Sequence, residues 1–132
     1  SEGTEHGMTA NSFTSVSMQP PLVLVCLHND ARMSRMLERG MRFGLSVLAA
    51  DHQCLSMHFA GRPQPDLLVL FAWDRGVPFI SGAAATFLCR ATDSHVAGDH
   101  TVCLGEVESF QHTDRPPLVF CRGGYQLLER RA

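Results

Sequence analysis

After a loop at residues 62–65, the chain consists mostly of short segments with strand patterns, and this succession restricts its fold more than any other feature. The segments are residues 67–73, 82–92, 101–110 and 118–121. Apolar runs and alternation of this length, separated by Gly, Pro and Asp, are typical of β-strands. The alanines of the second segment also suit a helix, and Gly105 in the third suggests a β-bulge. Strands that follow one another without intervening helices favour an antiparallel sheet.

The first half of the chain alternates between short strand and short helix patterns. Residues 23–27 predict a buried strand, and residues 43–47 alternate as a half-buried strand does. Apolar residues at helical spacing predict a helix over residues 31–39 and a second one between Asp51 and Gly61. There is no G-x-G-x-x-G sequence, which disfavours a doubly wound nucleotide-binding fold. The pattern predicts a mainly β, α+β fold with a closed or partly closed barrel.

Composition and charge exclude several classes of protein. The 132 residues suit one domain with one core, and 45% of them are apolar, too many for a disordered chain. The net charge is −2 without a basic run, which argues against binding to nucleic acid. All 11 basic residues are arginine, so Schiff-base catalysis, P-loop phosphate binding and Ser–Lys dyads are excluded.

The five cysteines are scattered, contain no C-x-x-C pair and mostly lie in apolar stretches, where cysteine packs as a small hydrophobe. We therefore expect free thiols, no metal site and a reducing, cytoplasmic setting. No apolar run approaches the roughly 20 residues that cross a bilayer. The polar N-terminus also lacks the layout of a signal peptide, so no membrane association is expected.

Three segments carry polar groups that suit a ligand, although each also has a structural explanation. Residues 7–17 are rich in hydroxyl groups, which could contact a polar ring or phosphate or form the polar face of an edge strand. Asn29 or Asp30 can cap the first helix, whose start, together with Arg32, could attract an anion. Residues 120–123 end a strand with an arginine beside glycines, so they could hold part of a nucleotide or simply terminate the sheet.

Two histidines are further candidates. His58 and Phe59 close the second helix, where a histidine is usually exposed and a phenylalanine usually belongs to the core. His100 follows Gly98 and Asp99 ahead of a strand. It can therefore project from the strand end as an acid, a base or a hydrogen-bond donor, whereas the structural alternative is a turn with a capping aspartate.

These segments also form a colinear series of blocks that spans most of the chain. The blocks are residues 7–25, 42–43 with 47–48, 58–61, 97–100, 105–107, and 118–120 with 122–123. Together they closely resemble the flavin reductase-like family, which includes small NAD(P)H:flavin oxidoreductases that serve two-component monooxygenases. The resemblance implies an FMN-binding split β-barrel of antiparallel Greek-key type with short flanking helices. It also implies a homodimer with flavin in a groove near the subunit interface.

The resemblance implies roles for individual residues. Flavin contacts would come from Gly7, Met8, Thr9, Asn11 and Ser12 around the isoalloxazine and ribityl chain, Cys26, Leu27 and His28 beside the ring, Arg32 and Met33 at the phosphate, and His58 and Phe59 closing the pocket. His100 would face the nicotinamide and assist hydride transfer as the candidate catalytic residue. The nucleotide would also be held by Phe120, Cys121, Arg122 and Gly123.

The implied activity is hydride transfer from NADH or NADPH to FMN or FAD. The reduced flavin would then diffuse to a separate, reduced-flavin-dependent monooxygenase. Because the cofactor carries the chemistry, the protein need not supply a nucleophile. The alternatives are a non-catalytic electron carrier or sensor that retains FMN, a split barrel that has lost cofactor binding, and a pyridoxamine-phosphate oxidase. The last would need more basic residues at its phosphate site than this chain offers.

The chain departs from the usual family pattern in three places. The family usually has a helix and a strand before Gly7, so we expect residues 1–132 to form a single flavin reductase-like domain that lacks them. Met33 stands where Ser or Thr commonly helps to bind the phosphate. The stretch after Pro65 is shorter and less typical than in many relatives.

Overall fold

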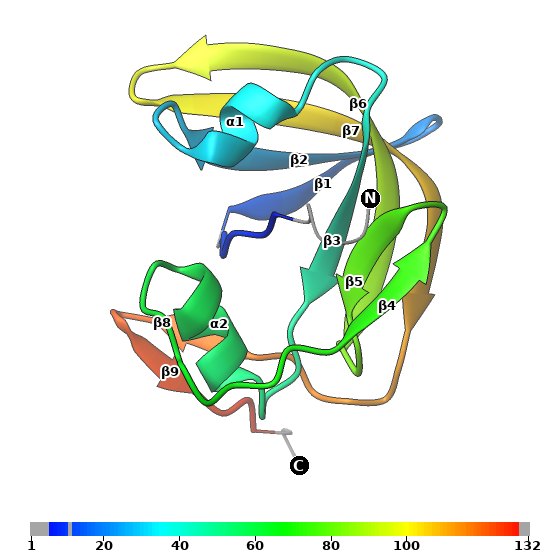
Figure 1. Ribbon diagram of the computed structural model, residues 1–132. Helices are drawn as coiled ribbons and strands as arrows, with labels where there is room; N and C mark the ends of the chain where they lie inside the picture. Colours follow the sequence, from blue (N-terminus) through cyan, green and yellow to red (C-terminus); the bar gives the residue numbers. More distant parts are fainter. Residues whose placement is uncertain (1–5, 11, 130–132) are drawn as a thin grey trace.

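The computed structural model describes residues 6–10 and 12–129. In chain order the elements are β1 (Phe13–Met18), β2 (Pro21–His28), α1 (Arg32–Met36), β3 (Arg42–Val47), α2 (Gln53–Phe59), β4 (Phe71–Asp74), β5 (Val77–Ile80), β6 (Ala85–Ala97), β7 (His100–His112), β8 (Val119–Cys121) and β9 (Gly124–Gln126). Five strands form an antiparallel sheet in the order β1-β2-β7-β6-β3, and β4–β5 and β8–β9 are separate hairpins (Figure 1). The mainly β prediction is therefore confirmed.

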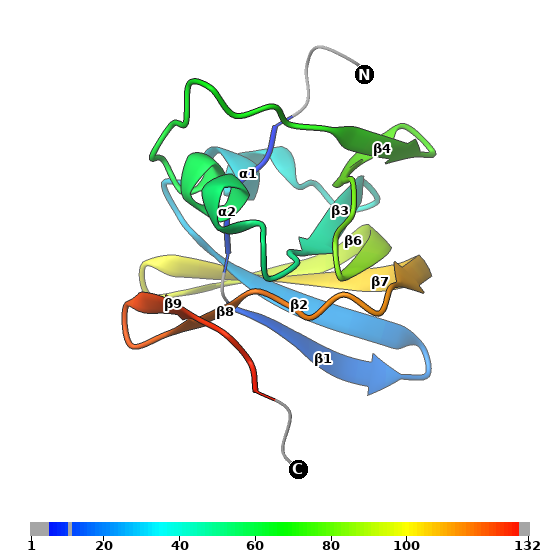
Figure 2. The same ribbon diagram turned by 90° about the horizontal axis from the view of Figure 1, so that it is seen from below.

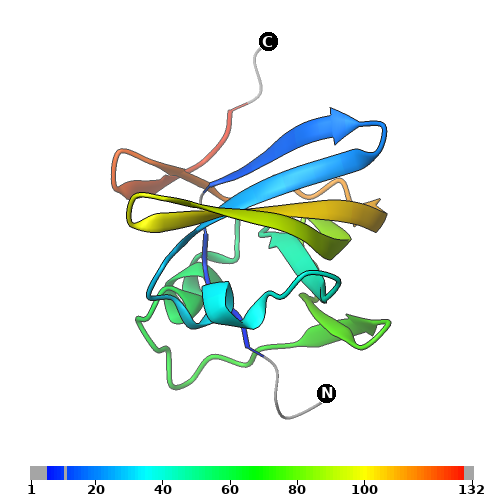
Figure 3. The same ribbon diagram turned by 90° about the horizontal axis from the view of Figure 1, so that it is seen from above.

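Both helices lie on the same face of the five-stranded sheet, as the views from below and from above show (Figures 2 and 3). Strand β2 alternates toward this core, with Val23, Val25 and Leu27 buried and the residues between them only partly covered. Strand β1 forms one edge of the sheet and exposes most of its side chains. The hydroxyl-rich segment thus contributes a polar edge strand, as its structural interpretation predicted.

Strands β6 and β7 form a hairpin of 13 residues on each side, longer than most strands in globular proteins. Its register shifts twice, between Leu88 and Cys89 and between Ala91 and Ser94. Such bulges bend a strand and increase its twist. As a result the sheet curls, and the ring of Phe13 on β1 lies 5.5 Å from that of Phe87 on β6, although β2 and β7 separate these strands in the sheet.

The interior of this bent sheet leaves no room for a side chain at Gly105. A Cβ atom built there would lie 2.6 Å from the Phe43 ring and 3.3 Å from Cys89 Cβ. Phe43 and Cys89 form a buried cluster with Val23 and Ala91. The expected bulge does lie next to Gly105, in the register of β6, but the glycine itself is required by the close approach of Phe43.

The β4–β5 hairpin covers the end of the sheet at β3. A Cβ atom at Gly44 would lie 2.7 Å from the Phe79 ring and 2.9 Å from Val77 Cγ1, so β5 packs directly on the β3 backbone. Val77 and Phe79 are buried with Leu88 of β6. The turn between β4 and β5 has positive φ at Arg75 and Gly76, as a two-residue hairpin turn requires.

The cysteines behave as the sequence predicts. Among the described residues all five are free thiols, and they include the buried Cys89 and Cys103 and the exposed Cys54 and Cys121. Burial, followed by the nearby Glu108 carboxylate, raises the pKa of Cys89 to about 12. Burial also raises the pKa of Cys103. Both buried thiols stay protonated at neutral pH and pack as apolar groups.

Helix α1 is shorter than predicted and is not capped by Asn29 or Asp30. It spans Arg32–Met36, Ala31 occupies the N-cap position, and no side chain caps it. The helix ends at Met36. Leu37, the next residue, is extended and packs against both buried clusters on the sheet. Tertiary packing therefore overrides the helical spacing that continues to residue 39. Helix α2 agrees with its prediction and is followed by Gly61 at φ 88°.

Two strand predictions also needed tertiary information. Residues 67–70 are not part of a strand. Among the described residues only the Leu70 carbonyl bonds to the following hairpin, accepting from the Ser81 N–H at 3.0 Å, and Leu68 and Leu70 are exposed. The ambiguous alanine-rich segment is the start of strand β6, where it pairs with both β3 and β7. Strands β5 and β9 were not predicted. Within the described residues no helix is long and apolar enough to cross a membrane.

Candidate functional site

The segment at residues 7–9 runs alongside the end of helix α2. The backbone N–H of Thr9 donates to the Phe59 carbonyl at 3.1 Å, and the Thr9 hydroxyl donates to the Ser56 carbonyl at 2.6 Å. A Cβ atom at Gly7 would lie 3.1 Å from the Phe59 ring, so the glycine lets the backbone approach the aromatic face closely. The two Thr9 donors therefore anchor this segment, and the hydroxyl oxygen keeps its capacity to accept a hydrogen bond.

Met8 brings the same segment onto the apolar core. It packs with Met33 of α1 against the buried cluster of Val25, Leu27 and Cys103 on β2 and β7. Met8, Met33 and Leu27, which the resemblance assigns to the flavin site, thus meet here, but their side chains belong to the core. Only their backbone, or the partly exposed ends of the two methionines, could border a ligand.

Ser12 and Cys26 are joined by hydrogen bonds. The Ser12 hydroxyl donates to the Cys26 carbonyl at 2.9 Å, and the Cys26 N–H donates to the Ser12 carbonyl at 3.2 Å. This pair holds the start of β1 on β2, so the role of Ser12 in the structure is to fix the strand. Asn11, the neighbouring predicted flavin contact, lies outside the described residues.

Arg32 stands at the start of α1 and is exposed. Among the described residues it forms no ion pair, so its guanidinium is available to an anion. Burial, and then the positive charge of Arg32, lower the pKa of His6. His6 therefore belongs to the neighbourhood of Arg32, which sequence reasoning did not indicate.

His58 is turned toward the loop that follows α2. Its Nδ1 accepts a hydrogen bond from the Gln64 N–H at 3.1 Å, and its ring meets the Phe59 ring edge-on at 5.1 Å. His58 thus orients Phe59 against the N-terminal segment and fixes the loop, in addition to any contact that it makes with a ligand.

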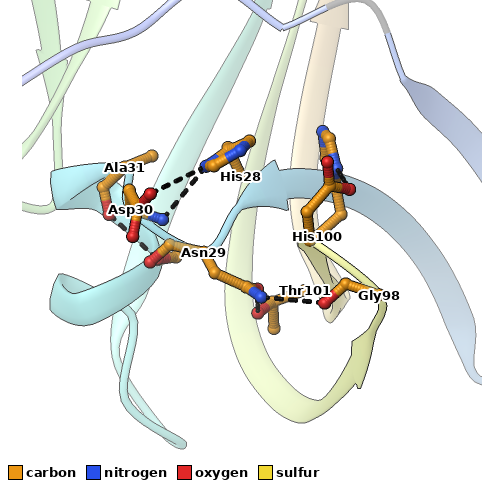
Figure 4. Close-up of polar contacts among 9 residues, drawn as sticks. His28, Asn29, Asp30, Ala31, Gly98, His100 and Thr101 are labelled. Atoms are coloured by element: carbon orange, nitrogen blue, oxygen red, sulfur yellow. Dashed lines mark hydrogen bonds and ion pairs between the residues drawn. The ribbon is translucent and has the colours of Figure 1, made fainter.

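His100 begins β7, directly after the Gly98–Asp99 turn, and lies opposite His28 of β2 (Figure 4). Its Nδ1 lies 2.8 Å from the Asp99 carboxylate, and its ring meets the His28 ring edge-on at 5.2 Å. The hydrogen bond from His100, followed by its charge, lowers the pKa of Asp99. Asp99 is therefore an exposed carboxylate that orients the imidazole from the side of Nδ1.

Asn29 ties this turn to the end of β2. Its Nδ2 donates to the Gly98 carbonyl at 3.0 Å, and its Oδ1 accepts from the Thr101 hydroxyl at 2.7 Å (Figure 4). Sequence reasoning treated Asn29 as a helix cap and gave Thr101 no role. No local signal could have corrected this, because the two residues meet only through the β2–β7 register.

The predicted nucleotide residues Phe120, Cys121, Arg122 and Gly123 form the β8–β9 hairpin. The hairpin turns through Arg122 and Gly123, both at positive φ. Its attachment was missed by sequence reasoning: the Tyr125 hydroxyl donates to Ser56 Oγ of α2 at 3.0 Å, and the Tyr125 ring meets Phe120 at 5.2 Å.

The predicted residues therefore lie along one side of the molecule. In Figure 1 the β6–β7 turn and the β8–β9 hairpin lie above and below the N-terminal segment, with α1 and α2 in front of them. Two open hollows of about 250 Å³ each lie elsewhere. One is lined by the β4–β5 hairpin and the far halves of β6 and β7, the other by the start of α2 and the following loop.

Comparison with known proteins defines the class. The family described as the flavin reductase like domain matches residues 1–129, and this chain belongs to that family. An NADH-dependent flavin reductase of a Rhodococcus species is 45% identical over 97% of this chain and 73% of its own length. The solved flavin reductase PheA2 superposes with a TM-score of 0.91, at 38% identity over 98% of this chain and 84% of its own. The styrene monooxygenase flavin reductase of Pseudomonas putida S12 gives a TM-score of 0.88, at 33% identity over 100% of this chain and 87% of its own.

Proposed function

We propose that this chain is an NAD(P)H:flavin oxidoreductase that passes hydride from the nicotinamide to FMN or FAD. Reduced flavin then leaves for a partner monooxygenase. NADH is the donor we test first, since the Rhodococcus relative is named for it. The partner class follows from the Pseudomonas relative, which is the flavin reductase of a monooxygenase.

The observation that carries this proposal is the meeting of four chain segments around the end of β2. Residues 7–9, α1 and α2 meet there through Met8, Met33 and Phe59, and the His100 turn lies at the same strand end. The donor set fits a flavin: backbone and small residues on one side, an aromatic ring from Phe59, and for a phosphate the cation Arg32, which forms no ion pair with the residues that the structure describes.

Flavin supplies the hydride acceptor, so the chain needs no nucleophile of its own. Residues 7–9 and Arg32 bind and orient the flavin. His100, held by Asp99 at Nδ1, presents its Nε2 to the nicotinamide side and orients it. The β8–β9 hairpin carries Phe120 and Arg122 to contact the remainder of the dinucleotide.

We further propose that residues 1–132 form one domain arranged as a split barrel and that two copies associate. The curl of the sheet that brings Phe13 to Phe87 supports the barrel. The exposed apolar side chains of Met18, Phe110 and Phe120 support a dimer, because isolated soluble chains rarely leave so much apolar surface uncovered. Five free thiols suit a reducing, cytoplasmic compartment.

The deciding experiment measures NADH and NADPH oxidation in air, with and without added FMN or FAD, on the purified protein. Oxidation that requires free flavin and saturates with it is the expected result. A yellow protein that oxidises neither nucleotide would instead be a carrier that retains FMN. A colourless protein that is inert with every flavin and nucleotide would contradict both functions.

A further inference from the structure

Among the described residues, Asn29 is the one residue outside the β6–β7 hairpin that hydrogen-bonds to the Gly98–Asp99 turn. The Asn29 side chain contacts Gly98 through its amide nitrogen and Thr101 through its amide oxygen, at 3.0 and 2.7 Å. The Asn29 backbone N–H donates to the Asp99 carbonyl at 2.9 Å. Asn29 thus hydrogen-bonds to the chain both before and after His100 (Figure 4).

This restraint matters because, among the described residues, the Asp99 and His100 side chains hydrogen-bond only to each other, and the His100 ring otherwise meets the His28 ring edge-on at 5.2 Å. The Asp99 side chain is 79% exposed and the His100 side chain 46% exposed. Their mutual contact, 2.8 Å between Asp99 Oδ1 and His100 Nδ1, depends on the direction in which the turn points the carboxylate. The Ala97–His100 pair closes the two-residue turn, with Gly98 at φ 63°, but this backbone pairing does not fix the direction of the Asp99 side chain.

The amide of Asn29 has no competing structural task. Helix α1 begins without a side-chain cap, and in the described part of the chain the one hydrogen bond between Asn29 and that helix is to the Asn29 backbone carbonyl, which accepts from the Ser34 hydroxyl at 3.1 Å. Both polar ends of the side chain are thus directed at the turn.

We propose that Asn29 is the positioning residue for His100: by clamping the Gly98–Asp99 turn onto the end of β2, it sets the orientation in which His100 meets the nicotinamide. This inference rests on the proposed function for its kinetic consequence, whereas the clamp itself is a property of the folded chain. Asn29 acts through the turn and through Asp99, and its substitution affects the nucleotide step rather than flavin binding.

The first test replaces Asn29. Asn29→Ala removes both side-chain contacts, and Asn29→Asp keeps the acceptor for Thr101 while replacing the donor to Gly98. We expect each to lower kcat for NADH about tenfold, because small misplacements of reacting groups have effects of this size or larger, with the KM for flavin unchanged. Gln111→Ala removes an exposed amide at the opposite end of β7 and should match the parent protein.

A double-mutant cycle separates positioning from general damage. In a His100→Ala background, Asn29→Ala should have almost no further effect on kcat, because the group that it positions is gone. An undiminished tenfold loss in that background would overturn the proposal, as would an Asn29→Ala enzyme with parental kinetics. If Asn29→Ala folds poorly, Thr101→Val is tested in its place. This variant removes one of the two side-chain contacts of Asn29 and preserves the shape of the side chain, so a smaller loss of kcat is expected.

A readout without activity distinguishes this inference from the proposed function. Titration of the Asp99 carboxyl by ¹³C NMR should show its pKa rising toward the ordinary value in Asn29→Ala, because the contact with His100 loosens. The other titratable groups that face it, His28 and the neighbouring Asp30, are unchanged in this variant. If the parent protein oxidises no nucleotide, the proposed function fails while this titration still decides the clamp. An unshifted Asp99 titration would contradict the clamp itself.

Discussion

At the residue scale, Gly105 has the least room of any glycine described above. The position its Cβ would take is already filled by the Phe43 ring at 2.6 Å. We expect Gly105→Ala to lower the free energy of unfolding by about 1–3 kcal/mol, as overpacking of a core does. Gly124→Ala is the matched control, since its nearest neighbour lies at 3.5 Å and it should change stability by less than about 0.5 kcal/mol. Urea denaturation of both variants checks this, and equal losses would contradict it.

His100 is the second residue whose substitution is informative. We expect His100→Ala to lower NADH turnover by about 10²-fold or less, the lower range for an assisting general acid–base group, while flavin affinity changes little. The measurement is steady-state kinetics with NADH varied at saturating flavin, together with flavin titration. Equal losses in both quantities, or none in either, would count against an assisting role in the nucleotide step.

The sequence identified the residue types of the candidate site better than their contacts. His100 and Arg32 were singled out from type and position, whereas the role of Phe59 came only from the family resemblance, and all three roles stay predictions. Thr9 and Met33 lie in the same region, but their donors or side chains contact the protein itself. Such partners are set by pairing between segments that are distant in sequence, which local patterns do not contain.

At the scale of the elements, Glu108 forms a link across three strands. It lies between the pairs Leu88–Ser109 and Cys89–Val107 and has no partner on β6, so it is the extra residue of the bulge. Its carboxylate accepts from Arg42 at 2.8 Å on β3 and contacts Arg90 at 3.5 Å on β6. Arg42 and Arg90 face each other across the strands. The carboxylate relieves a repulsion that would otherwise weaken this edge.

The pH dependence of stability should report on Glu108. The hydrogen bond from Arg42, and then the charges of Arg42 and Arg90, lower the pKa of Glu108 in the folded state. The unfolded chain therefore binds a proton first, near pH 4.3, and stability present above that pH is lost as the pH falls through the folded pKa. Glu108→Gln should flatten the fall in unfolding free energy between about pH 5 and 3.

The control for that experiment is Glu106→Gln, an exposed carboxyl on the same strand that lies opposite Arg90 in the β6–β7 register but forms no ion pair among the described residues. It should retain the parental slope. A parental slope in Glu108→Gln as well would show that the three-strand link does not contribute to acid sensitivity.

Tyr125 makes a prediction about the β8–β9 hairpin. Tyr125→Phe keeps the ring on Phe120 and removes the hydroxyl that donates to Ser56, so we expect a loss of about 1 kcal/mol in unfolding free energy. Amide exchange in β8 and β9 should accelerate more than in β2. Ser56→Ala in the same background should add almost nothing, since the bond is already absent. Additive losses would contradict a direct coupling.

Strand and helix identities were largely predictable, whereas their ends were not. A short apolar run was sufficient to predict β2, and period-two alternation was sufficient for β3. The early end of α1 at Leu37 and the start of β4 only at Phe71 depend on neighbours that only the folded chain supplies. The same holds for Gly105, whose necessity comes from Phe43, far away in sequence.

At the scale of the whole molecule, the bent β6–β7 hairpin joins two regions. One end carries the His100 turn, and the other carries Phe110 and stacks it on Phe87 at 6.1 Å. Light scattering after size exclusion should give twice the 14.5 kDa chain mass if two copies associate. Specific activity should then fall on dilution together with the mass if the flavin groove lies between the copies. A monomer with full activity would contradict the dimer.

The β4–β5 hairpin contains the chain's single tryptophan, Trp73, which is partly exposed next to Phe71. Figure 1 places this hairpin on the side of the molecule away from the His100 turn. Its intrinsic fluorescence is therefore a built-in optical probe of one hairpin. Trp73 fluorescence and amide protection in β2 can be followed through the same denaturant series. The comparison shows whether the β4–β5 hairpin loosens at a lower denaturant concentration than the sheet, without any added label.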